Sequence, residues 1–135
     1  MRAAFACIVV PPLLELISFA VIERALLALA RFSPAAALDD AQAAVYVDRF
    51  LGRLAGPWRW TCLRRASVLF YLLRGAGRNV DLCIGVRRDH DGSLHAHAWL
   101  LKDGALHLEA ERVRERVAEF SVIARFPSVH AAVAP

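Results

Sequence analysis

Residues 61–77 read TCLRRASVLFYLLRGAG and predict the helix around which the rest of the chain is arranged. Thr61 is a suitable N-cap, because its hydroxyl can accept a hydrogen bond from a free amide of the first turn. Residues 68–73 are apolar on nearly every side, which is typical of a helix buried in the centre of a domain. Two glycines after Arg74 supply a C-terminal cap. We therefore expect a central helix that begins at Cys62 and ends near Arg74.

Two further helices are expected before this one. The spacing of apolar residues predicts a helix with a broad apolar face over 13–31 and a second helix over 38–54. A membrane span needs about 18–20 uninterrupted apolar residues, and Glu15, Glu23 and Arg24 interrupt the first of these segments. The same charges, with a single basic residue near the start, argue against a cleaved signal peptide.

After the central helix the apolar period changes from helical spacing to alternation, which indicates strands. A charge-dense stretch over 111–119 is expected to be a loop or a short helix. Helices followed by an antiparallel sheet define the α+β class. The strands are expected over 79–86, 94–101, 105–109 and 120–126.

Length and composition bound the function. A chain of 135 residues suits one domain, and 58% hydrophobic residues exclude a disordered protein. The formal charge of +4 permits an acidic partner, but the basic residues are scattered among acidic ones, which argues against a nucleic-acid binder. Three cysteines are too few for a disulfide framework, so we expect a reducing, cytoplasmic location. We divide the chain into an N-terminal apolar helical segment (1–37), a folded core (38–127) and a C-terminal tail (128–135).

Cys62 is the candidate nucleophile, because it lies at the start of the central helix. The positive end of the helix dipole and the free backbone amides favour the thiolate and lower the thiol pKa. The backbone N–H of Cys62 is also placed to stabilise an oxyanion. The alternative is a small buried residue that begins a core helix. Cys83, in the middle of a strand, and Cys7, in an apolar stretch, are expected to be inert.

His97 is the candidate base. His95 and His97 are two residues apart on one predicted strand, so their side chains point to the same face. Such a pair also occurs in metal sites, but the cysteines form no C-x-x-C motif and no third ligand has suitable spacing. We therefore expect neither a metal nor a cofactor.

The turn after the second strand decides which acidic residue can orient His97. A three-residue turn over 102–104 pairs residue 101 with residue 105 and places Glu109 opposite His97 on the same face. A two-residue turn places Glu109 on the opposite face. A Cys62–His97–Glu109 triad therefore requires the longer turn.

Four motifs stand out along the chain: W-T-C-L-R-R-A at 60–66, L-C-I-G-V at 82–86, H-A-H-A-W at 95–99 and D-G at 103–104. In these motifs the sequence resembles the transglutaminase-like protease of lasso-peptide biosynthesis, a family known as B proteins. The resemblance covers about residues 38–125 and implies an α+β, papain-like cysteine protease fold, with the helices packed on a small antiparallel sheet. It also implies a leader peptidase, which cuts a ribosomally made precursor between leader and core. Residues 1–37 lack the winged-helix pattern of a leader-recognition domain.

By this resemblance, the chain is the stand-alone protease half, and its partners are the precursor, a separate recognition protein and a lasso cyclase. Cys62 takes the role of nucleophile and His97 that of general base and acid. The family usually has Asp as the third member, whereas this chain has Glu109, or Glu111 if the register shifts. The residues expected to line the substrate cleft, or to pack beside it, are Trp60, Trp99 and His95.

Two other functions stay open. The same triad serves a transglutaminase-like amidase or acyltransferase that acts on another peptide, and the fold also suits a catalytically inactive peptide-binding module. For residues 1–30 three roles are open: core packing, a docking surface for the recognition protein, or contact with a membrane.

Overall fold

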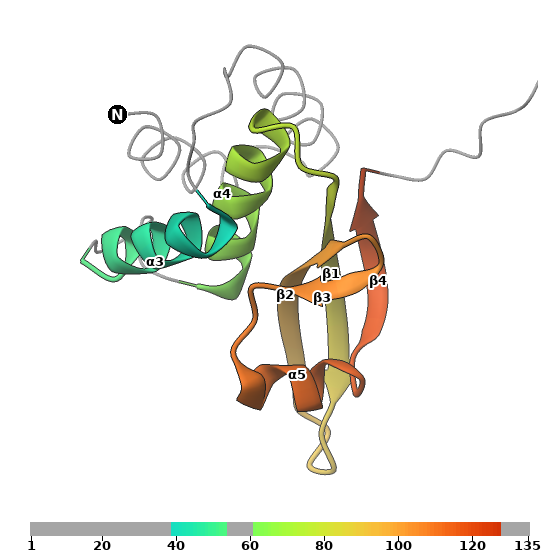
Figure 1. The fold of residues 1–135 in the computed structure, drawn as a ribbon. Helices are drawn as coiled ribbons and strands as arrows, with labels where there is room; N and C mark the ends of the chain where they lie inside the picture. Colours follow the sequence, from blue (N-terminus) through green and yellow to red (C-terminus); the bar gives the residue numbers. More distant parts are fainter. Residues whose placement is uncertain (1–38, 54–60, 128–135) are drawn as a thin grey trace, which may run out of the picture.

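The computed structural model describes residues 39–53 and 61–127 (Figure 1). The described residues include neither the predicted helix over 13–31 nor Trp60. The roles proposed for residues 1–30 and for Trp60 therefore lie outside what the structure describes. Within the described residues, three helices accompany a four-stranded antiparallel sheet, which confirms the α+β class. No helix in the described ranges is both long and apolar enough to cross a membrane.

The central helix is α4 (Cys62–Gly75), as predicted. Its N-cap is Thr61, whose Oγ1 accepts a hydrogen bond from the amide of Arg64 at 3.2 Å. At the other end, Gly77 adopts a φ of 78° and its amide bonds to the carbonyl of Arg74 at 3.0 Å. Glycine is favoured there because it has no Cβ that would clash with the backbone in the left-handed conformation. Both ends of the helix are therefore set by local sequence.

Helix α3 (Asp40–Leu51) packs against α4, and the two helices lie on the same side of the sheet (Figure 1). It buries one stripe of residues at helical spacing, whereas Val45 and Tyr46 are exposed. The helix ends at Leu51, slightly earlier than predicted, where the amide of Gly52 bonds to the carbonyl of Asp48.

The sheet has the strand order β3-β2-β1-β4. Its strands are β1 (Val80–Arg88), β2 (Leu94–Lys102), β3 (Ala105–His107) and β4 (Ser121–Phe126), and the short helix α5 (Glu111–Val117) lies between the last two. All four predicted strands are present, but β3 ends two residues early. Burying a large apolar side chain stabilises a fold by about 1.5–3 kcal/mol. The sheet residues that pack with α3 and α4 in the main core are Val80, Leu82, Ala98 and Leu100.

A buried carboxylate ties α3 to the sheet. Asp40 is 8% exposed and accepts hydrogen bonds from Lys102 Nζ at 2.7 Å and Arg78 Nε at 3.1 Å. Nε2 of His107 lies 3.0 Å from the same carboxylate. Burial by itself raises the pKa of Asp40, but these donors outweigh it and hold the pKa below 3.8. The carboxylate is therefore ionised and joins the start of α3 to the ends of β2 and β3.

The turn after β2 has two residues and not the three that the triad argument required. Lys102 pairs with Ala105, so the turn contains only Asp103 and Gly104. These residues have φ values of 53° and 80°, as a type I′ hairpin requires. Aspartate–glycine is a preferred pair for this turn, because both residues tolerate positive φ and the turn matches the twist of the strands. The register is therefore shifted by one residue from the expected one.

Candidate active site

Cys62 is the first residue of α4 and faces β2. Its pKa lies below the ordinary value of 9.0, mainly because its side chain interacts by hydrogen bonding with His97. Burial opposes this effect, and a hydrogen bond from the backbone of Ala98 adds to it. The position at the helix start and the partner on the strand therefore both favour the thiolate.

His97 lies on β2 between the thiol and a carboxylate. The pKa of His97 is raised from 6.5 to about 9, first by Cys62 and then by Glu109, against the effect of burial. Nε2 of His97 lies 3.7 Å from Oε2 of Glu109, which is too long for a hydrogen bond but within reach of a charge interaction. The lowered pKa of Cys62 and the raised pKa of His97 both favour a thiolate–imidazolium pair.

Glu109 reaches His97 although the turn has two residues, so the expectation that the triad needs a longer turn is wrong. Strand β3 ends at His107, and Leu108 adopts a positive φ of 59°. This conformation interrupts the alternation of side chains that the sequence argument assumed. The chain leaves the sheet edge and the Glu109 side chain, only 7% exposed, turns toward the face that carries His97.

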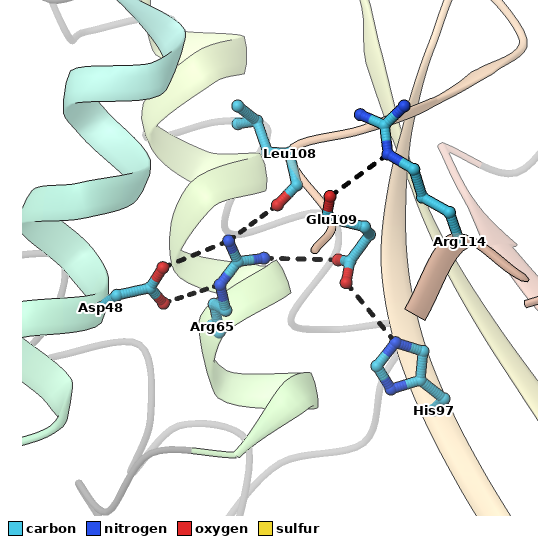
Figure 2. Close-up of polar contacts among 6 residues, drawn as sticks. All are labelled: Asp48, Arg65, His97, Leu108, Glu109 and Arg114. Atoms are coloured by element: carbon cyan, nitrogen blue, oxygen red, sulfur yellow. Dashed lines mark hydrogen bonds and ion pairs between the residues drawn. The ribbon is translucent and has the colours of Figure 1, made fainter. Parts of the chain in front are cut away.

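Arg65 was given no role from the sequence, yet it holds the acidic residue in place (Figure 2). Its Nη1 donates to Oε1 of Glu109 at 3.3 Å, and its Nη2 donates to the carbonyl of Leu108 at 2.8 Å. Its Nε donates to Asp48 of α3 at 2.7 Å. Arg65 follows Cys62 by three residues on α4, a spacing that places both on one helix face. That spacing is the sequence signal that could have identified Arg65.

Aromatic rings pack against the imidazole of His97. Trp99 stacks on His97 with ring centroids 6.0 Å apart, and Phe120 contacts both rings. Trp99 is only 3% exposed, which agrees with core packing rather than with a place in the cleft. A Cβ on Gly85 would lie 2.6 Å from the Trp99 ring, so glycine is required beneath it. This packing restricts where the His97 ring can lie.

Two cavities meet at His97. One has a volume of about 340 Å³ and is lined by Cys62, Arg65 and Glu109 among others. The second, of about 530 Å³, is lined by His95 and by residues of α5, which places one of the expected cleft residues at a cavity wall. The residues common to both cavities are His97, Arg112 and Val113.

The other candidate residues lie away from this site. Glu111, the alternative third member, is 84% exposed on α5 and pairs with Arg114 at 3.8 Å. Cys83 is buried in β1, and burial raises the pKa of its thiol, so it is a poor nucleophile.

A thiol at the start of a helix, an imidazole on the neighbouring strand and a buried carboxylate just after the next strand resemble the arrangement of papain-like and transglutaminase-like enzymes. No curated protein and no solved structure is similar enough to this chain to count as a match. A protein-family model described as the transglutaminase-like superfamily matches residues 6–125. That match spans most of the chain. The chain therefore belongs to the transglutaminase-like superfamily.

Proposed function

We propose that this protein is a cysteine peptidase that removes the leader from a ribosomally made lasso-peptide precursor. The observation that carries the proposal is the proximity of Cys62 to His97, with the thiol pKa lowered and the imidazole pKa raised. Membership of the superfamily supports a cysteine-peptidase or acyltransferase chemistry. The motifs at 60–66, 82–86 and 95–99 support the choice of a lasso-peptide precursor as substrate.

In the proposed mechanism, the Cys62 thiolate attacks the carbonyl carbon of the last leader residue. A carbon–sulfur bond forms, and the carbonyl oxygen becomes an oxyanion that the backbone N–H of Cys62 stabilises. Nε2 of His97 faces Glu109, which leaves Nδ1 to exchange a proton with the reacting groups. His97 donates its proton to the leaving core amine as the carbon–nitrogen bond breaks.

Hydrolysis of the acyl-enzyme completes the cycle. Water attacks the thioester carbon while neutral His97 accepts its proton, and the carbon–sulfur bond breaks to release the leader carboxylate and the thiolate. Glu109 compensates the charge of the imidazolium each time it forms. In this scheme, Glu109 does not itself transfer a proton.

We further propose that the enzyme acts in the cytoplasm with a separate leader-recognition protein and a cyclase. The released core amine is the nucleophile that an ATP-using cyclase would join to an acidic side chain. The recognition protein would bind the leader and deliver the cleavage site to Cys62. We propose residues 1–30 as the segment that meets this partner.

The direct test is cleavage of a precursor peptide in the presence of the recognition protein, followed by mass spectrometry. The expected products are the intact leader and a core peptide with a free amine. Cys62→Ala is expected to abolish cleavage, whereas Cys83→Ala, a matched change of a buried thiol outside the site, is expected to retain it. Cleavage by Cys62→Ala would refute the proposed nucleophile.

The same experiment separates the other functions. Transfer of the leader acyl group to an added primary amine, in preference to water, would identify an acyltransferase. Binding of the precursor without any change in its mass, at the concentration that gives full binding, would identify an inactive peptide-binding module.

A further inference from the structure

An unbalanced positive charge lies beside Cys62. Arg112 of α5 lines both the cavity that contains the thiol and the larger cavity next to it. Arg116, one helical turn further along α5, lines the larger cavity. Both side chains are on exposed residues, and no carboxylate within residues 39–53 and 61–127 pairs with either.

The carboxylates in the walls of these cavities are engaged elsewhere. In the smaller cavity, Asp48 and Glu109 both bind Arg65. In the larger cavity, Asp89 lies 2.9 Å from Arg87 and 3.1 Å from His95. The charges of Arg112 and Arg116 therefore remain available to a ligand.

We infer that the enzyme selects peptides that carry an aspartate or glutamate within about two residues of the scissile bond, on the side that occupies the larger cavity. The inference rests on the proposed function, since it names the substrate class of the same site. An extended peptide advances about 3.3 Å per residue, and the two cavities share His97 as a wall. A peptide that presents its carbonyl to Cys62 therefore brings a neighbouring side chain beside Arg112, whose guanidinium can bind a carboxylate with two hydrogen bonds.

The first test uses small reagents and needs no substrate. Iodoacetate and iodoacetamide alkylate a thiolate by the same displacement of iodide, but only iodoacetate carries a negative charge. The ratio of their rates at Cys62, measured by mass spectrometry of the labelled site, reports the local charge. Relative to free cysteine, the wild-type ratio is expected to favour iodoacetate.

The variants Arg112→Gln and Arg88→Gln remove the same charge from different places. Arg88 is exposed at the end of β1 and is not among the residues that line either cavity. Arg112→Gln is expected to lower the ratio about two- to fivefold, as for a solvent-exposed charge pair, and 0.5 M salt is expected to weaken the difference. Arg88→Gln is expected to leave the ratio unchanged.

A ratio that Arg112→Gln does not alter, or that Arg88→Gln lowers equally, would overturn the inference while Cys62 remained a reactive nucleophile. An inert Cys62 with both reagents would instead refute the proposed function, and the inference with it. The second test compares peptides with Glu or Gln on either side of the cleavage site. The ratio of kcat/KM for Glu over Gln is expected to exceed one on one side and to fall in Arg112→Gln by the same factor as in the alkylation experiment.

Discussion

Arg65→Gln is expected to destabilise the fold and to weaken the active site together. The guanidinium of Arg65 is the only group in Figure 2 that contacts three separate acceptors: the carboxylates of Asp48 and Glu109 and the carbonyl of Leu108. Glutamine retains part of the aliphatic stem and an amide donor, but it cannot reach all three acceptors. The change therefore removes the link between the two helices and the segment that carries Glu109.

The size of the expected stability loss follows from how deeply each partner of Arg65 is buried. Glu109 is 7% exposed and loses a hydrogen bond between charged groups, worth about 1.5–3 kcal/mol. The carbonyl of Leu108 loses its charged donor, which costs about 1–2 kcal/mol. Asp48 is 40% exposed, so water replaces much of that interaction and it contributes at most about 1 kcal/mol. We expect a loss of about 3–5 kcal/mol in the free energy of unfolding, typical of breaking a buried ion pair.

Thermal unfolding followed by circular dichroism measures this loss. For a chain of this size, it corresponds to a decrease of about 10–20 °C in Tm. Arg65→Lys keeps the charge but not the planar fork, and is expected to recover only part of the stability. Arg88→Gln is the control for the loss of one surface charge and is expected to change Tm little.

A second measurement separates the effect of Arg65 on stability from its effect on the position of Glu109. At a temperature where all variants are folded, Arg65→Lys is expected to reduce kcat for peptide cleavage, and the effects of Arg65→Gln and Glu109→Gln are expected to be non-additive. A Tm within about 2 °C of wild type, together with additive effects, would refute the role given to Arg65.

Asp40→Asn is expected to lower the free energy of unfolding by about 2–3 kcal/mol, measured by urea denaturation, because a buried carboxylate holds three donors. Because the pKa of Asp40 is lowered in the fold, the stability that its carboxylate contributes is fully present above the ordinary pKa of 3.8 and is lost as the pH falls through the lower folded pKa. A stability difference between wild type and Asp40→Asn that did not change with pH would contradict this. Gly85→Ala is expected to cost about 1–3 kcal/mol and to reduce cleavage, because its Cβ meets the ring of Trp99; unchanged melting and activity would argue against this packing. Alkylation of Cys62 by iodoacetamide is expected to persist below pH 9.0 in wild type and to require higher pH in His97→Ala, whereas equal pH profiles would disprove the pairing. Peptide cleavage is expected to fall above about pH 9, where His97 loses the proton that the leaving amine needs.

The helix and strand positions were predictable because their signals are local. Thr61 provides a side-chain oxygen at the start of α4, and Gly77 can adopt the left-handed conformation at its end. Strand β1 places Val80, Leu82, Ile84 and Val86 at alternate positions, and β2 begins with apolar residues that alternate with His95 and His97. Each of these features depends on residues within a few positions of one another, so the sequence alone was sufficient.

The link from His97 to Glu109 depended on two backbone conformations, of which the sequence indicates only one. Asp103-Gly104 is a preferred pair for a two-residue turn, which shifts every pair by one position relative to a three-residue turn. The positive φ of Leu108 then cancels that shift for Glu109. Leucine rarely adopts this conformation, so nothing in the sequence indicated it. The hydrogen bond from Arg65 to the Leu108 carbonyl, formed only in the folded structure, helps to hold it.

The placement of Arg65 explains how a glutamate can serve in a position where the resemblance implies aspartate. An aspartate at the end of a regular strand reaches its histidine from the sheet, whereas here β3 ends at His107 and the chain leaves the sheet before the acidic residue. The longer side chain, by about 1.5 Å, spans this gap, but it also has one more rotatable bond to restrain. Arg65 restrains it from α4, the same helix that carries Cys62. The candidate nucleophile and the group that fixes Glu109 therefore belong to one helix, and His97 on β2 needs only to lie between them.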